Sequence, residues 1–476
     1  MDTVWLFLKG LLILIQVILI FNVIIIVHEL GHFLAARWRG LKVTKFQVWF
    51  GKPIWKKKFN GVEYGLGSIP AGGFVALPQM APMDLIEGGN ENAAEKLAPA
   101  SPIDKIIVAI AGPIFSMLLA FVFGAIVWAI GYPKDVIKST VIGHVVAGDP
   151  AEAAGLRPGD EIVAINGTEV KEFFGMIDSV KERIAMSIGD SIEITYRRPG
   201  VDEIQVADCG FNVDDGTLTK RPGLRMVGIA PEVPPIVQSV LEHSPAALAG
   251  LQEGDLLVSA NGEKLFSHFS VAALTETGQP IKFEVERAGQ LLPMTITPAQ
   301  PIQPEEAPLA LGIAWNTDGV YTHEIAKPTP LAQVLTGVKV IWRTLSAVAS
   351  PKSDIGLKQL SGPVGISKAY YNFLSEPDGW RMVFWFSVIL NVNLAILNML
   401  PLPVLDGGHI TLAITEMIRR RPVSGRVMEY LQAGCAILLI SFMAYVTWFD
   451  GADTIRQIGG AVGDKPEPTK FAPPAE

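Results

Sequence analysis

Five consecutive residues could hold a metal ion: His28 to His32 read His-Glu-Leu-Gly-His. On a helix, side chains four positions apart lie on the same face, so both imidazoles can bind one zinc ion while Glu29 lies beside the metal-bound water. The chain has only 7 His, so a chance match is of order one in a hundred or rarer. The apolar residues around the motif argue against the alternative, two His and a Glu that stabilise a helix surface. The motif therefore predicts zinc-dependent hydrolysis.

Four apolar runs are long enough to cross a bilayer. A helix that rises about 1.5 Å per residue needs roughly 20 apolar residues for ~30 Å of hydrocarbon, or as few as ~17. None of the runs contains Asp, Glu, Lys or Arg, and they are Gly10 to Val27, Ile106 to Ile130, Met382 to Leu405 and Leu431 to Phe449. Buried helices of soluble proteins rarely run so long without charge, so we expect four membrane spans. No small-residue cleavage site follows the first run, so we expect it to be retained.

Basic residues in the connections predict the orientation, because cytoplasmic loops carry an excess of Lys and Arg. They gather after the first run and between the third and fourth runs, at Arg37, Arg39, Lys42, Lys45, Lys52, Lys56 to Lys58, Arg419, Arg420, Arg421 and Arg426. We expect these two connections in the cytoplasm. Residues 132–380 and both termini then lie outside.

A catalytic zinc ion usually takes three protein ligands and a water molecule, so a third ligand must come from elsewhere in the chain. Asp406 ends the third run, in Asn398-Met-Leu-Pro-Leu-Pro-Val-Leu-Asp-Gly-Gly-His409. The first and third spans both end toward the cytoplasm, so Asp406 and the two His are expected at similar depth. His409 is a competing ligand, ranked lower because it lies farther beyond the run. Arg37, the first cation after His28, lies nine positions farther along the chain, or ~14 Å of helix, which places the site below the membrane surface.

Composition excludes two classes of protein. The balance of 39 Lys+Arg against 47 Asp+Glu gives a net charge of −8, with 18% charged and 49% hydrophobic residues. The chain is too apolar for disorder, and it lacks the basic surface that nucleic acid requires, so no nucleic-acid partner is expected. Cys209 lies in the external region and Cys435 in the fourth run, so no disulfide framework is expected.

An internal repeat occupies the external region. Asp149 to Gly167 (DPAEAAGLRPGDEIVAING) aligns without a gap on Ser244 to Gly262 (SPAALAGLQEGDLLVSANG), at an offset of 95 residues. Each copy predicts a short helix or turn, a Gly-Asp turn, a half-buried strand and an Asn-Gly hairpin turn, within one small domain. The pattern resembles the PDZ domain, in two copies over about residues 138–313. The resemblance implies capture of extended peptides or their C-termini by strand addition; the alternative is that the repeated Gly and Asp only make turns.

The motifs together resemble the site-2 protease family of intramembrane zinc proteases. H-E-x-x-H in the first span, N-x-x-P-x-P-x-x-D-G in a later one and tandem PDZ-like domains between them carry the resemblance, which covers nearly the whole chain. It implies a multi-pass α-helical membrane protein with four transmembrane helices and two tandem PDZ-like α/β domains inserted between spans two and three. The implied activity is cleavage of single-pass membrane proteins within or near their spans. Implied substrates are an anti-sigma factor already trimmed by another protease, in the bacterial envelope stress response, and remnant signal peptides.

Carried over by position, the resemblance implies that His28, His32 and Asp406 bind Zn²⁺. Glu29 would act as general base on the bound water and then as proton donor to the leaving amine. Zinc would lower the pKa of that water to about 7 and polarise the scissile carbonyl. The implied location is the bacterial inner membrane, with the PDZ-like domains and both termini periplasmic and the active site within the membrane toward the cytoplasm.

Two further features are expected to hold the substrate. Asn398 and Asn393 of the third span would bind its backbone or the developing oxyanion; interhelical hydrogen bonding is the alternative. Val62 to Leu77 carries alternating apolar residues, four Gly and one Pro, which predicts a hairpin or loop that re-enters the membrane edge. The resemblance matches it to a β-hairpin whose exposed edge pairs with an extended substrate, with the expected contacts at Gly72, Gly73, Phe74 and Val75. A loop on the membrane surface is the alternative.

The expected domains follow from these elements. Residues 1–136 hold the first two spans, 137–231 and 232–318 the two PDZ-like domains, 319–380 an amphipathic region, 381–455 the last two spans and 456–476 a flexible, Pro-rich tail. Apolar periodicity from Ala332 to Val348, followed by a Gly-Pro loop, predicts amphipathic helices on the outer membrane face. Two other functions stay open: a membrane-anchored PDZ scaffold with a vestigial metal motif, and a zinc peptidase that cuts soluble peptides.

Overall fold

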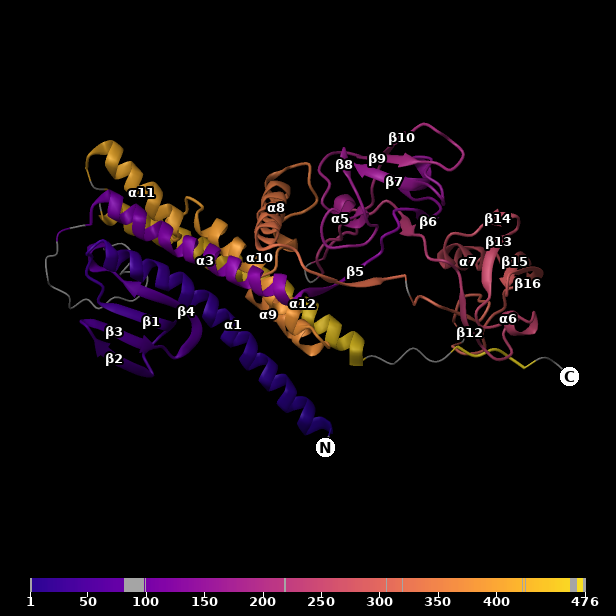
Figure 1. The fold of residues 1–476 in the computed structure, drawn as a ribbon, viewed down its shortest axis with the longest axis horizontal. Helices are drawn as coiled ribbons and strands as arrows, with labels where there is room; N and C mark the ends of the chain where they lie inside the picture. Colours follow the sequence, from indigo (N-terminus) through magenta and orange to yellow (C-terminus); the bar gives the residue numbers. More distant parts are fainter. Residues whose placement is uncertain are drawn as a thin grey trace. The chain divides into compact units, whose positions relative to one another are not determined.

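The computed structural model describes residues 2–80, 98, 100–217, 220–304, 306–318, 320–421, 423, 425–462 and 469–473. The chain forms two compact units, and each is described by itself. The helical unit comprises Met1–Pro133, Ile325–Trp342 and Ser361–Asp450, and the sheet unit comprises Lys134–Glu324, Arg343–Leu360 and Gly451–Glu476. Figure 1 shows the elements of both units.

Among the described residues, four helices are long and apolar enough to cross a membrane. They are α1 (Asp2–Trp38), α3 (Pro102–Ile130), α10 (Trp380–Asn398) and α12 (Gly425–Val462). The α3 helix packs against α1, α10 and a shorter helix, α11 (Asp406–Arg419). Each of the four predicted spans thus contains a helix. The α3 helix packs against both α1 and α10, the helices of the first and third spans (Figure 1).

The ends of these helices differ from the predicted spans. The α1 helix continues through the His-Glu-Leu-Gly-His motif to Trp38, so the motif lies inside a helix rather than at its end. The predicted end of the third span at Leu405 is wrong, because α10 ends at Asn398. Pro401 and Pro403 follow, and proline has no N–H for the helical ladder. Asp406 is therefore the first residue of α11, not the last of a span.

A four-stranded sheet follows α1 in the helical unit. Its strands are β1 (Lys45–Phe50), β2 (Trp55–Phe59), β3 (Val62–Leu66) and β4 (Ile69–Ala76), in the order β2-β3-β1-β4. The predicted hairpin between Val62 and Leu77 is wrong in its pairing, because β1 lies between β3 and β4, parallel to the first and antiparallel to the second. As a result β4 is an edge strand, and it packs against α1. A 3-10 turn, η1 (Pro78–Met80), follows.

The region predicted to be amphipathic contains two helices, α8 (Pro330–Ala349) and α9 (Pro363–Ser375), and a 3-10 turn, η2 (Leu357–Gln359). The carboxylate of Asp450, on α12, accepts hydrogen bonds from the backbone N–H groups of Gly362 (2.9 Å) and Gly365 (2.8 Å). These N–H groups lie at the start of α9, where a helix has no backbone partners for them. The carboxylate therefore fastens α12 to α9 within the helical unit.

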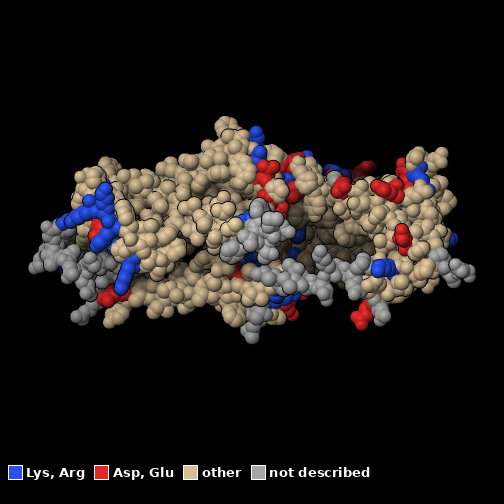
Figure 2. All heavy atoms as spheres, turned by 90° about the horizontal axis from the view of Figure 1, so that it is seen from below, with Lys and Arg blue, Asp and Glu red and all other residues tan. Residues whose placement is uncertain are grey.

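Charged side chains are unevenly distributed on the helical unit. Lys56, Lys57 and Lys58 on β2 are exposed, as are Arg419, Arg420 and Arg421 at the end of α11. Figure 2 shows Lys and Arg gathered near one end of this unit, beside a long stretch that is almost free of charge. An apolar stretch next to a basic end is typical of membrane spans and their cytoplasmic loops.

The sheet unit contains two copies of one arrangement, which we call the first repeat (residues 137–231) and the second repeat (residues 232–318). Each copy has a four-stranded sheet and a separate pair of strands. In each copy a short helix follows the first strand, and a second helix follows the Asn-Gly hairpin and precedes the next long strand. Each copy has its own buried apolar core. The predicted internal repeat is therefore a repeat of structure.

The first repeat consists of β6 (Ile142–Val145), α4 (Pro150–Ala153), β7 (Glu161–Ile165), β8 (Thr168–Glu169), α5 (Val180–Ala185), β9 (Ile192–Arg197), β10 (Gln205–Cys209) and β11 (Ile229–Pro231). The second consists of β12 (Val237–Val240), α6 (Pro245–Leu248), β13 (Leu256–Ala260), β14 (Glu263–Lys264), α7 (His268–Thr275), β15 (Ile281–Arg287), β16 (Gln290–Ile296) and β17 (Ile313–Trp315). The strand order is β8-β7-β9-β10 plus the pair β6-β11 in the first repeat, and β14-β13-β15-β16 plus the pair β12-β17 in the second. Two further strands, β5 (Tyr132–Val136) and β18 (Thr322–Ala326), pair with each other.

The residues that recur in the sequence make the same bonds in both copies. Asp160 accepts two hydrogen bonds of 2.8 Å from Arg198, and Asp255 accepts two of 2.6 Å from Arg287. Both carboxylates are almost fully buried. The Gly-Asp turns of the repeat are therefore held by equivalent ion pairs across the strands.

The flexible tail predicted for residues 456–476 is wrong for its first part, because α12 continues to Val462. It is also wrong for residues 469–473, where Phe471 is buried and Lys470 forms a bridge with Gln303. Residues 463–468 and 474–476 lie outside the described part of the chain.

Candidate active site

Three side chains that are distant in the sequence meet in the helical unit. Nε2 of His28 lies 3.3 Å from Nε2 of His32 and 3.3 Å from Oδ2 of Asp406, and Nε2 of His32 lies 3.4 Å from Oδ1 of Asp406. All three residues are buried. In the described part of the chain, they are the group whose ligand atoms lie within 4.8 Å of one another.

These distances suit one tetrahedral zinc ion. Ligand atoms at about 2.0–2.1 Å from zinc lie about 3.3 Å apart when the geometry is tetrahedral, which is close to the three distances in the cluster. Two imidazoles and a carboxylate are zinc donors, and a fourth position would stay open for water. Oδ2 of Asp406 is buried and has no hydrogen-bond partner in the part of the chain that the structure describes, as expected for an atom that a cation satisfies.

The second nitrogen of each imidazole is also held. Nδ1 of His28 lies 2.9 Å from the hydroxyl of Ser116, and Nδ1 of His32 lies 2.8 Å from the carbonyl oxygen of Val108. Such partners fix the tautomer and the orientation of a metal-binding ring. Both come from α3 and neither was predicted from the sequence, although Ser116 is the one hydroxyl side chain in the second apolar run.

Close packing of α3 on α1 brings these partners within reach. A Cβ added to Gly112 would lie 2.2 Å from Nε2 of His32 and 2.9 Å from Cε1 of His28. A Cβ added to Gly31 would lie 2.4 Å from the carbonyl oxygen of Ala111. Any side chain at either glycine would overlap its neighbours, so both glycines are needed for the approach of the two helices.

Glu29 follows His28 on α1 and is half-buried. It is not part of the three-residue cluster of possible ligands. A Cβ added to Gly73, on the edge strand β4, would lie 3.5 Å from Cγ of Glu29 and 3.3 Å from the side chain of Ile25. The edge strand therefore runs directly beside Glu29.

The other predicted residues of β4 lie on the same strand. Gly72 has a φ of +73°, and a Cβ there would overlap the ring of Phe50. Phe74 and Val75 are buried, with Val75 in a core that also contains residues of α1 and α3. The faces of this part of β4 are therefore packed, while one of its edges has no neighbouring strand among the described residues.

The two predicted asparagines of α10 differ in position. Nδ2 of Asn398 lies 3.3 Å from Nε2 of His28, so Asn398 borders the cluster. Oδ1 of Asn393 is buried and has no hydrogen-bond partner among the described residues. A third one, Asn391, is fully buried and donates to the carbonyl of Ser387, which is the structural use of a polar side chain in a membrane helix.

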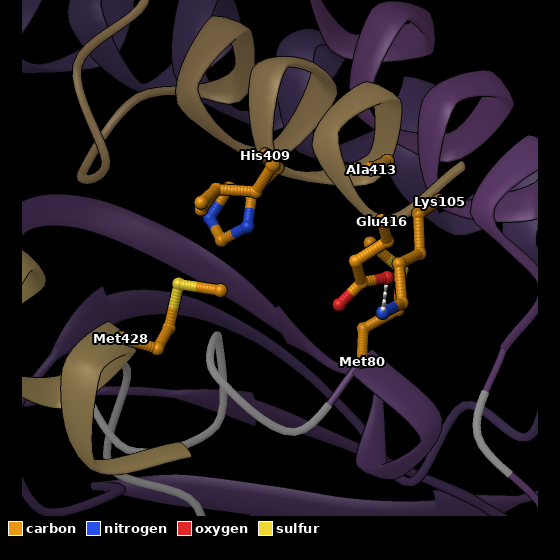
Figure 3. Close-up of a pocket in the computed structure, with 7 residues that line it drawn as sticks. Met80, Lys105, His409, Ala413, Glu416 and Met428 are labelled. Atoms are coloured by element: carbon orange, nitrogen blue, oxygen red, sulfur yellow. Dashed lines mark hydrogen bonds and ion pairs between the residues drawn. The ribbon is translucent and has the colours of Figure 1, made fainter. Parts of the chain in front are cut away.

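His409, the competing ligand, lies outside the cluster. Figure 3 shows its ring directed toward Met428 in a small pocket, where Lys105 and Glu416 also form an ion pair of 2.7 Å. The residues that line this pocket are Met80, Lys105, His409, Leu412, Ala413, Glu416 and Met428. Asp406, three residues earlier at the start of α11, contacts the histidines instead. A Cβ added to the next residue, Gly407, would lie 2.2 Å from the carbonyl oxygen of Met399. The chain from α10 thus packs tightly on the start of α11.

Helices of membrane-spanning length around two histidines, an aspartate and an adjacent glutamate define the class of membrane-embedded metallopeptidases. The chain belongs to peptidase family M50, whose model matches residues 16–442. It is accordingly a zinc metalloprotease.

Proteins similar to this chain carry corresponding names. It is 29% identical over 461 residues to the regulator of sigma-E protease RseP of Salmonella typhimurium, covering 91% of this chain and 97% of that protein. It is 28% identical over 452 residues to RseP of Escherichia coli, covering 90% and 96%. A putative zinc metalloprotease of Vibrio cholerae is 31% identical over 449 residues, covering 91% and 97%.

Proposed function

We propose that this zinc metalloprotease cuts single-pass membrane proteins within or near their spans. The observation that carries the proposal is the position of the histidines. They lie well inside α1, a helix of membrane-spanning length, and the first cation after them is Arg37. Ionisable side chains at membrane depth are costly and are kept where they act.

His28, His32 and Asp406 would hold the metal, since their ligand atoms have the spacing that zinc requires. Zinc, when bound, activates water and polarises the scissile carbonyl. Ser116 and the Val108 carbonyl, both on α3, orient the two rings through hydrogen bonds with their Nδ1 atoms. These bonds fix which ring nitrogen faces the metal.

Glu29 would move the proton. Its carboxylate accepts a proton from the attacking water and then passes it to the nitrogen of the leaving amine, so that one residue serves both steps. Asn398 would donate its amide N–H to the oxygen of the reacting carbonyl. It borders His28 on the side where α10 ends, and a donor at that place stabilises developing negative charge. Asn393 would bind the substrate backbone through its carbonyl oxygen, which has no hydrogen-bond partner among the described residues.

The edge strand β4 would hold the substrate in an extended form. A transmembrane helix hides its peptide bonds in its own hydrogen bonds, so local unwinding must precede cleavage. Strand addition replaces those bonds with bonds to an edge. The residues at Gly72 to Val75 run beside Glu29, so a strand added there would pass the cluster.

The two repeats of the sheet unit would be PDZ-like domains on the periplasmic side of the inner membrane. Their shared strand order and their Gly-Asp and Asn-Gly turns support this assignment. The basic residues of β2 and α11 support cytoplasmic placement of those elements. Placement of the site toward the cytoplasm follows from the same argument.

The substrate would be a protein of the envelope stress response. The relatives from Salmonella typhimurium and Escherichia coli are each named regulator of sigma-E protease. A matching role here is the cleavage of an anti-sigma factor that another protease has trimmed, and remnant signal peptides are a second substrate class. The PDZ-like domains would bind peptide C-termini or exclude substrates whose external part is still large.

The test is co-expression of the chain with a tagged single-span substrate that lacks most of its external domain. We expect the wild type to cut it, and Glu29→Gln to lower cleavage by ~10²–10⁴-fold, because the variant cannot carry the proton. Glu63→Gln, on β3 of the same unit, is the matched control and should cut normally. A zinc chelator should stop cleavage by the wild type.

Two outcomes would overturn the proposal. If Glu29→Gln cuts as well as the wild type, the proteolysis comes from another enzyme. If a short water-soluble peptide is cut as efficiently as the membrane substrate, the spans serve only as anchors. The family assignment and the intact cluster argue against a scaffold without catalysis.

A further inference from the structure

A short segment that follows α12, residues 469–473, lies on the second repeat of the sheet unit. The N–H of Lys470 donates to the carbonyl of Gln303 (3.0 Å), and the N–H of Ile302 donates to the carbonyl of Lys470 (2.8 Å). The two segments are antiparallel at this bridge. The partner segment pairs in turn with the rest of the repeat, through Ala299 and Ala310. Residues 469–473 thus extend the second repeat by backbone pairing.

One side chain of the segment is an anchor. Phe471 is only 5% exposed, whereas Lys470 and Ala472 on either side of it are exposed. Alternation of a buried and an exposed side chain is typical of a peptide bound by strand addition, in which backbone bonds supply affinity and a pocket supplies specificity.

The place of the Phe471 ring depends on a glycine. Gly312 has a φ of +76°, and a Cβ added there would lie 2.9 Å from Cε2 of Phe471 and 2.2 Å from Cβ of Ser244. Gly312 immediately precedes β17, and Ser244 caps the start of α6. The ring therefore rests against the loop that joins the edge pair β12-β17 to the rest of the repeat.

The equivalent place in the first repeat is filled differently. Gly228 corresponds to Gly312, and a Cβ added there would lie 2.3 Å from Oδ2 of Asp149. Asp149 stands where the second repeat has Ser244, and Nδ2 of Asn212 donates to it at 3.0 Å. A carboxylate with its own partner is a poor neighbour for an aromatic ring. The aromatic site therefore belongs to the second repeat.

We propose that residues 469–473 are an intramolecular ligand that occupies a peptide-binding site of the second repeat. The site takes extended peptides with an aromatic side chain at the position of Phe471. While the segment is bound, the site is closed to other chains. A competing peptide must displace the segment, so the chain regulates its own access to this surface. The segment and the second repeat both belong to the sheet unit, and their binding does not depend on the protease reaction.

The expected effect follows from effective concentration. A ligand tethered by a short link competes at an effective concentration of about 1 mM. If the free peptide binds with a Kd of about 100 µM, tethered competition weakens its apparent affinity about tenfold.

The test uses the full chain in detergent and a fluorescein-labelled peptide, Thr-Lys-Phe-Ala-Pro-Pro-Ala-Glu, whose binding is followed by anisotropy. We expect Phe471→Ala, which frees the site, to bind the peptide about tenfold more tightly than the wild type. Leu291→Ala, an exposed apolar residue of the same repeat, is the matched control and should behave as the wild type. A peptide with Ala in place of Phe should not bind. Equal affinity of the wild type and Phe471→Ala would overturn the proposal.

A reversible disulfide bond that holds the segment in place is a second test of the same site. Paired residues in antiparallel strands have Cα atoms about 4.5–5.5 Å apart, within the range for a disulfide. Gln303→Cys combined with Lys470→Cys should therefore cross-link on oxidation, whereas each single variant should not. The oxidised double variant should lose peptide binding and regain it on reduction. Failure to cross-link, or binding by the oxidised form as strong as by the reduced form, would contradict the proposal.

Discussion

The orientation of two imidazole rings is the central feature of the candidate site at the scale of single residues. Each ring presents Nε2 to the cluster and has Nδ1 held by α3. The spacing of the histidines follows from helix geometry alone, so a sequence motif suffices to predict it. Their partners on α3 depend on how two helices pack, which no local pattern specifies.

Ser116→Ala is expected to weaken zinc binding by about 10–100-fold, because the ring of His28 loses the partner that orients it. The measurement is zinc competition with a chelator on purified protein, together with residual proteolysis. Ser387→Ala removes another buried hydroxyl, one bonded to Tyr370 at 2.8 Å, and should keep the affinity of the wild type. Unchanged affinity for Ser116→Ala would mean that the hydroxyl does not support the ligand.

The carboxyl of Asp255 should make the second repeat sensitive to acid. Burial raises the pKa of this carboxyl, but hydrogen bonds from Arg287 and from the backbone N–H of Gln252 outweigh it and hold the pKa below its usual range. A lowered pKa in the folded state contributes stability above the unfolded value of about 3.9, and this is lost as the pH falls through the folded value.

We therefore expect Asp255→Asn to lower the melting temperature at pH 7 and to flatten its dependence on pH below about 4. Thermal unfolding of the full chain, followed by circular dichroism at several pH values, measures both effects. Asp318→Asn changes an exposed carboxyl of the same repeat and should leave the curve unchanged. Parallel curves for the wild type and Asp255→Asn would contradict the expectation.

At the scale of elements, the contact between α1 and α3 decides whether the site forms. Gly112→Ala should abolish zinc binding and proteolysis, because its Cβ would lie 2.2 Å from Nε2 of His32. Gly434→Ala, on α12, adds a Cβ that meets no described neighbour within 4 Å and should be neutral. Zinc content by mass spectrometry of the purified variants checks both. Normal zinc content in Gly112→Ala would show that the helices move apart at little cost.

The edge strand β4 is the second element on which activity should depend. Val75→Pro removes one backbone N–H of this strand and is expected to lower cleavage without loss of zinc. Lys57→Pro makes the same change on β2, the opposite edge of the sheet, and should cut normally. Turnover assays together with zinc content separate the two effects. Unchanged turnover by Val75→Pro would discard a role for β4 in substrate binding.

Element types were predictable from the sequence, but their neighbours were not. Apolar length predicts helices for all four spans, and the alternation near Val62 predicts extended chain. The insertion of β1 between β3 and β4 follows from pairing between strands that are far apart in the sequence. For the same reason the expected hairpin did not form.

At the scale of the whole molecule, the orientation in the membrane is testable by cysteine labelling. Glu203→Cys, in an exposed loop of the first repeat, should react with a membrane-impermeant maleimide in cells whose outer membrane is permeabilised. Lys57→Cys, on β2, should react only after the inner membrane is opened. The native Cys209 gives little background, because burial raises the pKa of its thiol to about 11. Labelling of Lys57→Cys in cells with an intact inner membrane would reverse the proposed orientation.

The sequence by itself determined the features that depend on local spacing. These are the His-Glu-x-x-His face of α1, the four apolar helices and the two copies of one small domain. The meeting of Asp406 with the histidines could be expected only through a depth argument, because helix packing joins residues that are remote in the chain. Tertiary structure alone decided the partners of the rings, the place of His409 in a separate pocket and the docking of Phe471, since each requires two surfaces to fit. Local periodicity describes one surface at a time, and complementarity between surfaces arises only in the folded chain.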